Sequence, residues 1–95
     1  MNQDERINIL KTAYEHRQRE FAMHQINIDN YRNALDIIRM DHSDDPDMQK
    51  FAEQLETLLA SSLVEQRKEK ILMQAIDCSL VPTLLYDVGL TEEAV

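Results

Sequence analysis

The sequence predicts an all-α protein: an antiparallel hairpin of two long helices, followed by a short C-terminal helical turn or tail. Apolar side chains recur at alternating three- and four-residue spacing through most of the chain, which is the heptad pattern of packed helices. Only one glycine and two prolines occur among the 95 residues, so few positions favour turns. We expect helices over about residues 3–40 and 46–78, forming a hairpin domain over 1–80 with a tail over 81–95.

The first predicted helix carries an unbroken heptad seam. Asn2 followed three positions later by Glu5 has the spacing of a capping box, so this helix is expected to begin near residue 3. Two consecutive seam positions, Arg17 and His24, are polar, and polar groups in a seam cost stability and fix register. The seam consists of Ile7, Leu10, Tyr14, Arg17, Phe21, His24, Ile28, Tyr31, Leu35 and Ile38.

A second set of apolar residues falls roughly opposite this seam on the same helix. One stripe can pack inside the hairpin, and a second stripe indicates contact with another chain. We therefore predict a homodimer, as a four-helix bundle or coiled-coil-like assembly. The alternative is that these are isolated exposed apolar residues, which are ordinary on soluble proteins. The predicted dimer interface is Ile9, Met23, Ile26, Ile37 and Met40.

Residues 41–47, with the sequence DHSDDPD, interrupt the periodic pattern and are expected to form the interhelical turn. Pro46 suits the first position of a helix after an Asp or Ser cap. Pro82 is expected to end the second helix, because the residue before a proline disfavours helical backbone. The expected buried face of this helix comprises Met48, Phe51, Ala52, Leu55, Leu58, Leu59, Ser62, Leu63, Met73, Ile76 and Leu80.

Folding the chain back at this turn brings two polar stretches together. Residues whose numbers sum to about 87 then lie opposite each other in an antiparallel pair. Arg17 would face Glu69 and Lys70, Phe21 would face Gln66, and His24 would face Ser62 or Leu63. The polar stretch EQRKEK of the second helix thus lies opposite the polar part of the first seam, which favours a hairpin over one continuous rod.

The formal net charge of −8 is concentrated in two places. Residues 41–60 hold six acids and one lysine, and residues 79–95 hold three acids and no base. This distribution argues against direct binding of nucleic acid, which requires clustered Lys and Arg. It leaves mimicry of nucleic acid open.

We expect a small protein–protein interaction module, an adaptor, assembly factor or inhibitor that presents an acidic tip and an apolar-acidic tail to a larger protein. The tail has a second interpretation, as a cap on its own bundle. The alternative function is an acidic nucleic-acid mimic that inhibits a DNA- or RNA-binding enzyme, although both predicted helices carry charges of mixed sign. The expected contact residues are Asp41, Asp44, Asp45, Asp47, Leu84, Leu85, Tyr86 and Leu90.

The sequence contains no catalytic motif or cofactor box, so we expect a non-enzymatic protein with no metal or cofactor. His16, Glu20 and His24 have a spacing that metal ligands on one helix can have. A histidine satisfied within the seam is the favoured interpretation, because Arg17 would repel a cation. The paired Glu-x-x-His motifs of di-iron bundles are absent. Cys78 has no histidine near it in sequence or in the predicted pairing.

A single cysteine excludes an internal disulfide, and we expect Cys78 to be a small buried hydrophobe in a reducing compartment. The N-terminal residues MNQDER are polar, and no run of about 18 apolar residues occurs. We expect a soluble cytoplasmic protein without a membrane segment.

Overall fold

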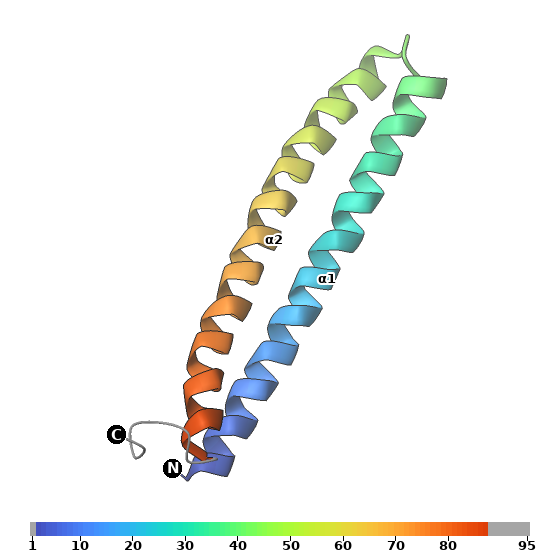
Figure 1. Ribbon diagram of the computed structural model, residues 1–95. Coiled ribbons are helices and arrows are strands. Elements are labelled where there is room, and N and C mark those ends of the chain that lie inside the picture. Colours follow the sequence, from blue (N-terminus) through green and yellow to red (C-terminus); the bar gives the residue numbers. More distant parts are fainter. Residues whose placement is uncertain (1, 88–95) are drawn as a thin grey trace.

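The computed structural model describes the backbone of residues 2–87 and the side chains of residues 2–80. Within these limits the chain is two long helices, α1 (Gln3–Asp41) and α2 (Pro46–Asp87), joined by a tight turn. The helices run antiparallel and side by side, so that the last turns of α2 lie beside the first turns of α1 (Figure 1). The prediction of an all-α helical hairpin is confirmed.

Both helices begin at side-chain caps that the sequence predicted. At α1, the Glu5 backbone N–H donates to Asn2 Oδ1 at 2.8 Å, and Asn2 Nδ2 donates to Glu5 Oε1 at 3.3 Å. At α2, Asp45 Oδ1 accepts from the backbone N–H groups of Asp47 and Met48 at 2.9 and 3.3 Å. These contacts satisfy donors that have no partner inside the helix.

The face of α1 that buries its side chains against α2 is the heptad seam predicted from the sequence. All ten of its residues are buried or half-buried, and Ile28, the most enclosed, is 1% exposed. Near the turn, Leu35, Ile38 and Leu55 form a core cluster. The complementary stripe of α2 keeps the same three- and four-residue spacing, and its members, all buried or half-buried, are Met48, Ala52, Leu55, Leu59, Ser62, Gln66, Glu69, Met73, Ile76 and Leu80.

Three residues expected in the interior lie at the surface. Phe51 and Leu58 are exposed because each lies one heptad position to the side of the α2 stripe, and a single facing helix covers only the stripe itself. Cys78 is also exposed, on the side of α2 that faces away from α1. The prediction that these side chains are buried was wrong.

The predicted end of the second helix near residue 78 was also wrong, since α2 continues through Pro82 to Asp87. A proline inside a helix removes one backbone hydrogen bond and crowds the preceding turn, which disfavours the helix without forbidding it. The last turns of α2 lie beside the first turns of α1 (Figure 1).

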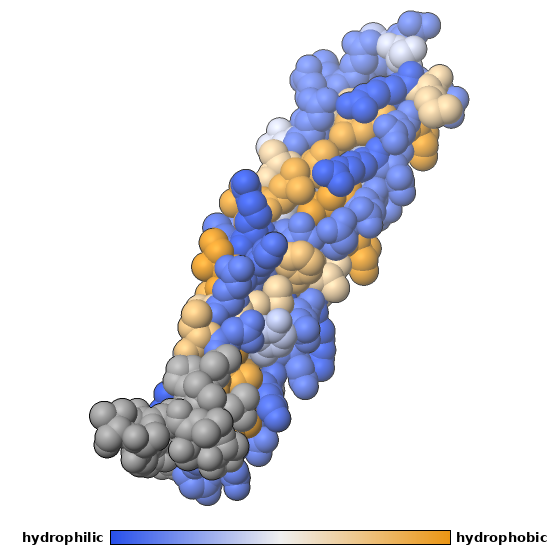
Figure 2. All heavy atoms as spheres, viewed as in Figure 1, coloured by the Kyte–Doolittle hydropathy of each residue, from blue (hydrophilic) through white to orange (hydrophobic). Residues whose placement is uncertain are grey.

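The hairpin is a rod with extents of 70 × 22 × 17 Å. Its radius of gyration, 21.0 Å, compares with about 12 Å for a compact domain of this length. Hydrophobic side chains follow the line between the helices, and hydrophilic ones cover most of the face in view (Figure 2). Within the described part of the chain, neither helix has a stretch apolar enough to cross a membrane. The buried hydrophobic residues in this part are Ile7, Ile28, Leu35, Ile38 and Leu55.

Truncation of Ile28 should be far more costly than the same truncation at an exposed site. We expect Ile28→Ala to lower the free energy of unfolding by about 2–5 kcal/mol, because it removes buried methyl groups and leaves a cavity. Ile71, which is 63% exposed on α2, provides the matched control, and Ile71→Ala should change it by less than about 0.5 kcal/mol. Urea unfolding at one fixed protein concentration measures both, and equal losses would contradict this description of the core.

Candidate functional site

Arg17 of α1 and Glu69 of α2 pair across the seam where its two polar stretches were predicted to meet. We call this part of the seam the polar layer. Arg17 Nη1 donates to Glu69 Oε1 at 3.2 Å and to Glu69 Oε2 at 3.1 Å. The Arg17 side chain is 32% exposed and that of Glu69 is 12% exposed, so this pair is much less hydrated than an ordinary surface salt bridge. The predicted pairing of these two residues across the hairpin is confirmed. A paired charge within a seam opposes sliding of one helix along the other.

His24 lies beside the same carboxylate. A ring nitrogen of His24 and carboxylate oxygens of Glu20 and Glu69 all lie within 4.8 Å of one another, and all three residues are half-buried. The pairing rule predicted Ser62 or Leu63 opposite His24. His24 lies near Glu69 because helical side chains lean toward the N-terminus of their own helix, which brings these two side chains toward each other.

The structure changes the membership of the candidate ligand group. His16, which shares regular spacing with Glu20 and His24, is exposed and is not part of the cluster. Glu69, which joins it from α2, was identified from the sequence only as the partner of Arg17. The signal that connects Glu69 to His24 is the antiparallel register, combined with the N-terminal lean of both side chains.

Glu65 lies next to this group and stays ionised. Lys68 Nζ is 2.9 Å from Glu65 Oε1. The hydrogen bond from Lys68 and its positive charge lower the pKa of Glu65 below its usual value, and His24 acts in the same direction. Two carboxylates, those of Glu20 and Glu69, therefore lie beside the imidazole at mid-length of the hairpin, and that of Glu65 is nearby.

One side of the hairpin is polar. Gln66 Nε2 donates to Gln25 Oε1 at 2.7 Å, and Arg39 Nη2 lies 4.0 Å from Glu56 Oε1. Gln25 and Arg39 belong to a single heptad row of α1, which also contains Lys11, Gln18 and Arg32.

On the opposite side, large apolar residues recur between polar ones. Glu20 of α1 and Glu65 of α2 both lie near His24, so the heptad rows that contain them border the same side. The row of Glu65 holds three large apolar residues, and the row next to that of Glu20 holds three more. All six are exposed. We call this surface the apolar flank; it consists of Ile9, Met23 and Ile37 of α1 and Phe51, Leu58 and Leu72 of α2.

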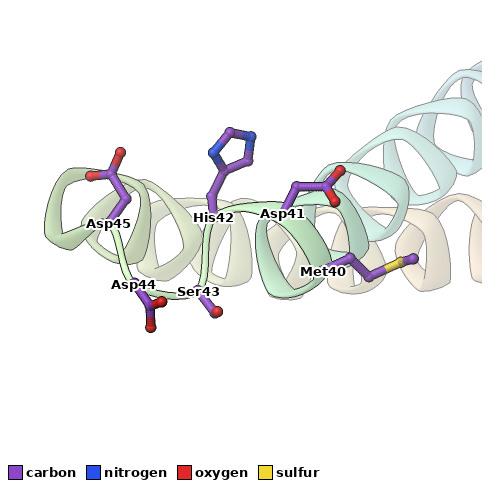
Figure 3. Close-up of a pocket in the computed structure, with 6 residues that line it drawn as sticks. All are labelled: Met40, Asp41, His42, Ser43, Asp44 and Asp45. Atoms are coloured by element: carbon purple, nitrogen blue, oxygen red, sulfur yellow. The ribbon is translucent and has the colours of Figure 1, made fainter.

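At the tip of the hairpin the acidic side chains diverge. Asp41, His42 and Asp45 project from one side of the turn, whereas Asp44 projects from the other (Figure 3). Asp45 is the cap of α2, and Asp47 lies in its first turn, where a negative charge suits the helix dipole. Two of the four aspartates expected to contact a partner thus have a role in the fold, and Asp41 and Asp44 remain exposed for contacts.

The tail residues expected to contact a partner lie at the edge of the described structure. Residues 84–86 belong to the last turns of α2 by their backbone, and their side chains lie outside the described residues. Leu90 lies outside them altogether. The exposed Asp41 and Asp44 lie at the turn, and residues 84–86 lie at the other end of the rod (Figure 1).

Comparisons of the chain with known protein families, with curated proteins and with solved structures each found no match.

The pairing of Arg17 with Glu69 generates a prediction for a double-mutant cycle. We expect Arg17→Met to lower the free energy of unfolding by about 1–3 kcal/mol, because it leaves Glu69 half-buried without its cation. Adding Glu69→Leu should recover most of that loss, since an apolar pair fits a seam. Urea unfolding of the single and double variants measures this effect. Additive losses in the double variant would show that the two side chains do not interact.

Asp44 and Asp45, neighbours at the tip, allow a matched test of the helix cap. Asp45→Ala should lower the free energy of unfolding by about 1 kcal/mol, because two backbone N–H groups lose their acceptor. Asp44→Ala, at an exposed neighbouring position, should leave it within about 0.5 kcal/mol of the parent protein. Thermal unfolding followed by circular dichroism distinguishes the two, and equal effects would contradict the capping role of Asp45.

Proposed function

We propose that this chain is a non-enzymatic protein–protein interaction module whose hairpins pair as a homodimer through the apolar flank, forming a four-helix bundle. In this proposal the tip and the C-terminal tail contact a larger protein. The observation that carries the pairing is the exposure of six large apolar side chains, three from each helix, on one side of the rod. Large exposed apolar side chains gathered on one side of a soluble protein favour an interaction surface there.

The apolar flank is spread over an area large enough for a stable interface. From Ile9 to Ile37 it extends about 42 Å along α1, and the hairpin is 22 Å wide. The rectangle with these sides, which also contains polar residues, is about 900 Å² per protomer, and each partner in a standard interface buries roughly 800 Å². Pairing would also give the rod the second layer that four-helix bundles use to bury their core.

Five of the six flank residues are arranged symmetrically about its centre, which favours a second copy of this chain as the occupant. The sixth, Phe51, has Ser79 at the symmetric position. Ile9 and Ile37 lie fourteen residues to either side of Met23, and Leu58 and Leu72 lie seven residues to either side of Glu65. A twofold axis through Met23 would place Ile9 of one protomer over Ile37 of the partner subunit. Such self-complementarity is what a twofold interface requires.

Met23 and Glu65 lie at nearly the same level of the hairpin, because Arg17 and Glu69 pair a few residues away from each. The same axis therefore suits both helices. It would bring two copies of Glu65 together at the centre. The Lys68 ammonium, 2.9 Å from Glu65, supplies a compensating charge in each protomer.

This interface differs from the one predicted from the sequence. Ile26 and Met40 are exposed, as expected, but lie on the row of α1 that points away from α2. The proposed interface keeps Ile9, Met23 and Ile37 and adds the three apolar residues of α2.

For the larger partner, the supporting observations are the free carboxylates of Asp41 and Asp44 at the tip, and the apolar sequence of residues 84–86 at the end of α2. We further propose a cytoplasmic setting, because a reducing compartment keeps an exposed thiol such as Cys78 free of disulfides.

Nucleic-acid mimicry has less support. A mimic needs unpaired carboxylates spaced along a face. In the described structure Glu69 pairs with Arg17, Glu65 with Lys68, and both Asp36 and Glu56 lie near Arg39, so cations interrupt any such series.

Charged substitutions within the apolar flank should separate the protomers. We expect Met23→Asp and Leu58→Asp each to convert the dimer to a monomer at micromolar concentration, because each buries an unpaired charge in the interface. Ile71→Asp on the far side of α2 is the matched control and should leave the dimer intact. Light scattering coupled to gel filtration measures the mass of each variant.

Circular dichroism on the same samples checks that the helices persist. A monomeric parent protein at every concentration would contradict pairing, and so would a dimer that tolerates both flank substitutions. Loss of the dimer in Ile71→Asp alone would place the interface on the other face.

A further inference from the structure

We propose that the hairpin binds a divalent transition-metal ion, such as Zn²⁺, through Glu20, His24 and Glu69. These three donors come from two helices, and their ligand atoms lie within 4.8 Å of one another. They form the one group of this kind among the side chains of residues 2–80. All three donors belong to one chain, so the proposed site does not depend on pairing of the hairpins.

The donor set has the chemistry of a transition-metal site. One imidazole nitrogen with two carboxylate oxygens suits Zn²⁺ and its neighbours, whereas Mg²⁺ and Ca²⁺ favour sites made of oxygen alone. Zinc binds these atoms at about 2.0–2.2 Å, so donors on one tetrahedral ion lie about 3.5 Å apart. The present spacing requires each donor to move by about 1 Å, which rotation of glutamate side chains provides.

Two of the three donors are free to coordinate. Neither Glu20 nor His24 forms a hydrogen bond or salt bridge with another described residue. Because no polar side-chain atom without a partner is buried among the described residues, the donor atoms of Glu20 and His24 are open to solvent. Glu20 and His24 are four residues apart and therefore lie on adjacent turns of one helix face.

Glu69 can serve Arg17 and a metal ion together. A single nitrogen, Arg17 Nη1, contacts both carboxylate oxygens at 3.1 and 3.2 Å. A carboxylate has about four lone-pair positions, so acceptor capacity remains on each oxygen. The same contact holds the Glu69 side chain in place across the seam, as residues behind metal ligands commonly do.

The local charges also favour a dication. From the sequence alone, the positive charge of Arg17 was expected to disfavour a cation site. The structure places the carboxylates of Glu20 and Glu69 beside His24, with that of Glu65 nearby, and the charges of Arg17 and Lys68 are engaged by Glu69 and Glu65. An ion held here would also tie α1 to α2 at mid-length, and binding would therefore stabilise the folded hairpin.

The test is titration of the full chain with ZnCl₂, followed by calorimetry and by the histidine ring signals in NMR spectra. The chain has three histidines, and the exposed His16 and His42 are internal controls. We expect saturable binding of one ion per chain, with the His24 ring signals shifting and those of His16 and His42 unchanged. Because this measurement uses the unaltered protein, it does not depend on whether any variant folds.

Matched variants complete the test. His24→Ala and Glu20→Gln should each weaken zinc binding at least about tenfold, and His16→Ala should leave it within twofold. CaCl₂ should produce no saturable signal. The proposal is overturned if zinc does not bind, if His16→Ala and His24→Ala weaken binding equally, or if the His24 signals stay fixed while zinc binds elsewhere.

Discussion

The packing of one heptad stripe of α1 against one heptad stripe of α2 is the constraint on which this structure depends. A helix has seven heptad rows, and a single facing helix covers about two of them. The buried residues of both helices all lie on these stripes, from Ile7 near the open end of the hairpin to Leu55 near the tip. Everything outside the stripe stays at the surface whatever its chemistry, which explains a rod with so few fully buried residues.

The seam is not uniform, and its polar layer affects both the stability of the hairpin and the groups available to bind a ligand. Near the turn, Leu35, Ile38 and Leu55 pack as an ordinary hydrophobic cluster. At mid-length Arg17, His24 and Glu69 replace apolar residues, and the layer is satisfied mainly through the Arg17 and Glu69 contact. Such a layer contributes less hydrophobic stabilisation than leucine would, and it fixes register. It also places an imidazole among carboxylates, the arrangement from which the proposed metal site follows.

The rod shape and the apolar flank both fit the proposal of a protein–protein interaction module. Over residues 2–80, the hairpin is two helices thick, so most of its side chains lie at the surface. One side is polar, with the contacts of Gln25 and Arg39 to α2, and the other bears six exposed apolar side chains. This asymmetry is in keeping with the proposal that a second hairpin packs on the apolar flank to form a four-helix bundle.

The sequence by itself determined the helices, their caps, the turn and the seam of α1, because each depends on residues within about four positions along the chain. It also placed Arg17 opposite Glu69, since a short turn fixes the register of an antiparallel pair. Only the tertiary structure decided the rotation of α2 about its axis, which exposed Phe51 and Leu58, and the continuation of α2 past Pro82. It likewise decided that Glu69, rather than His16, joins Glu20 and His24. These features depend on how two helix surfaces fit together and on the directions in which side chains lean, which heptad spacing does not specify.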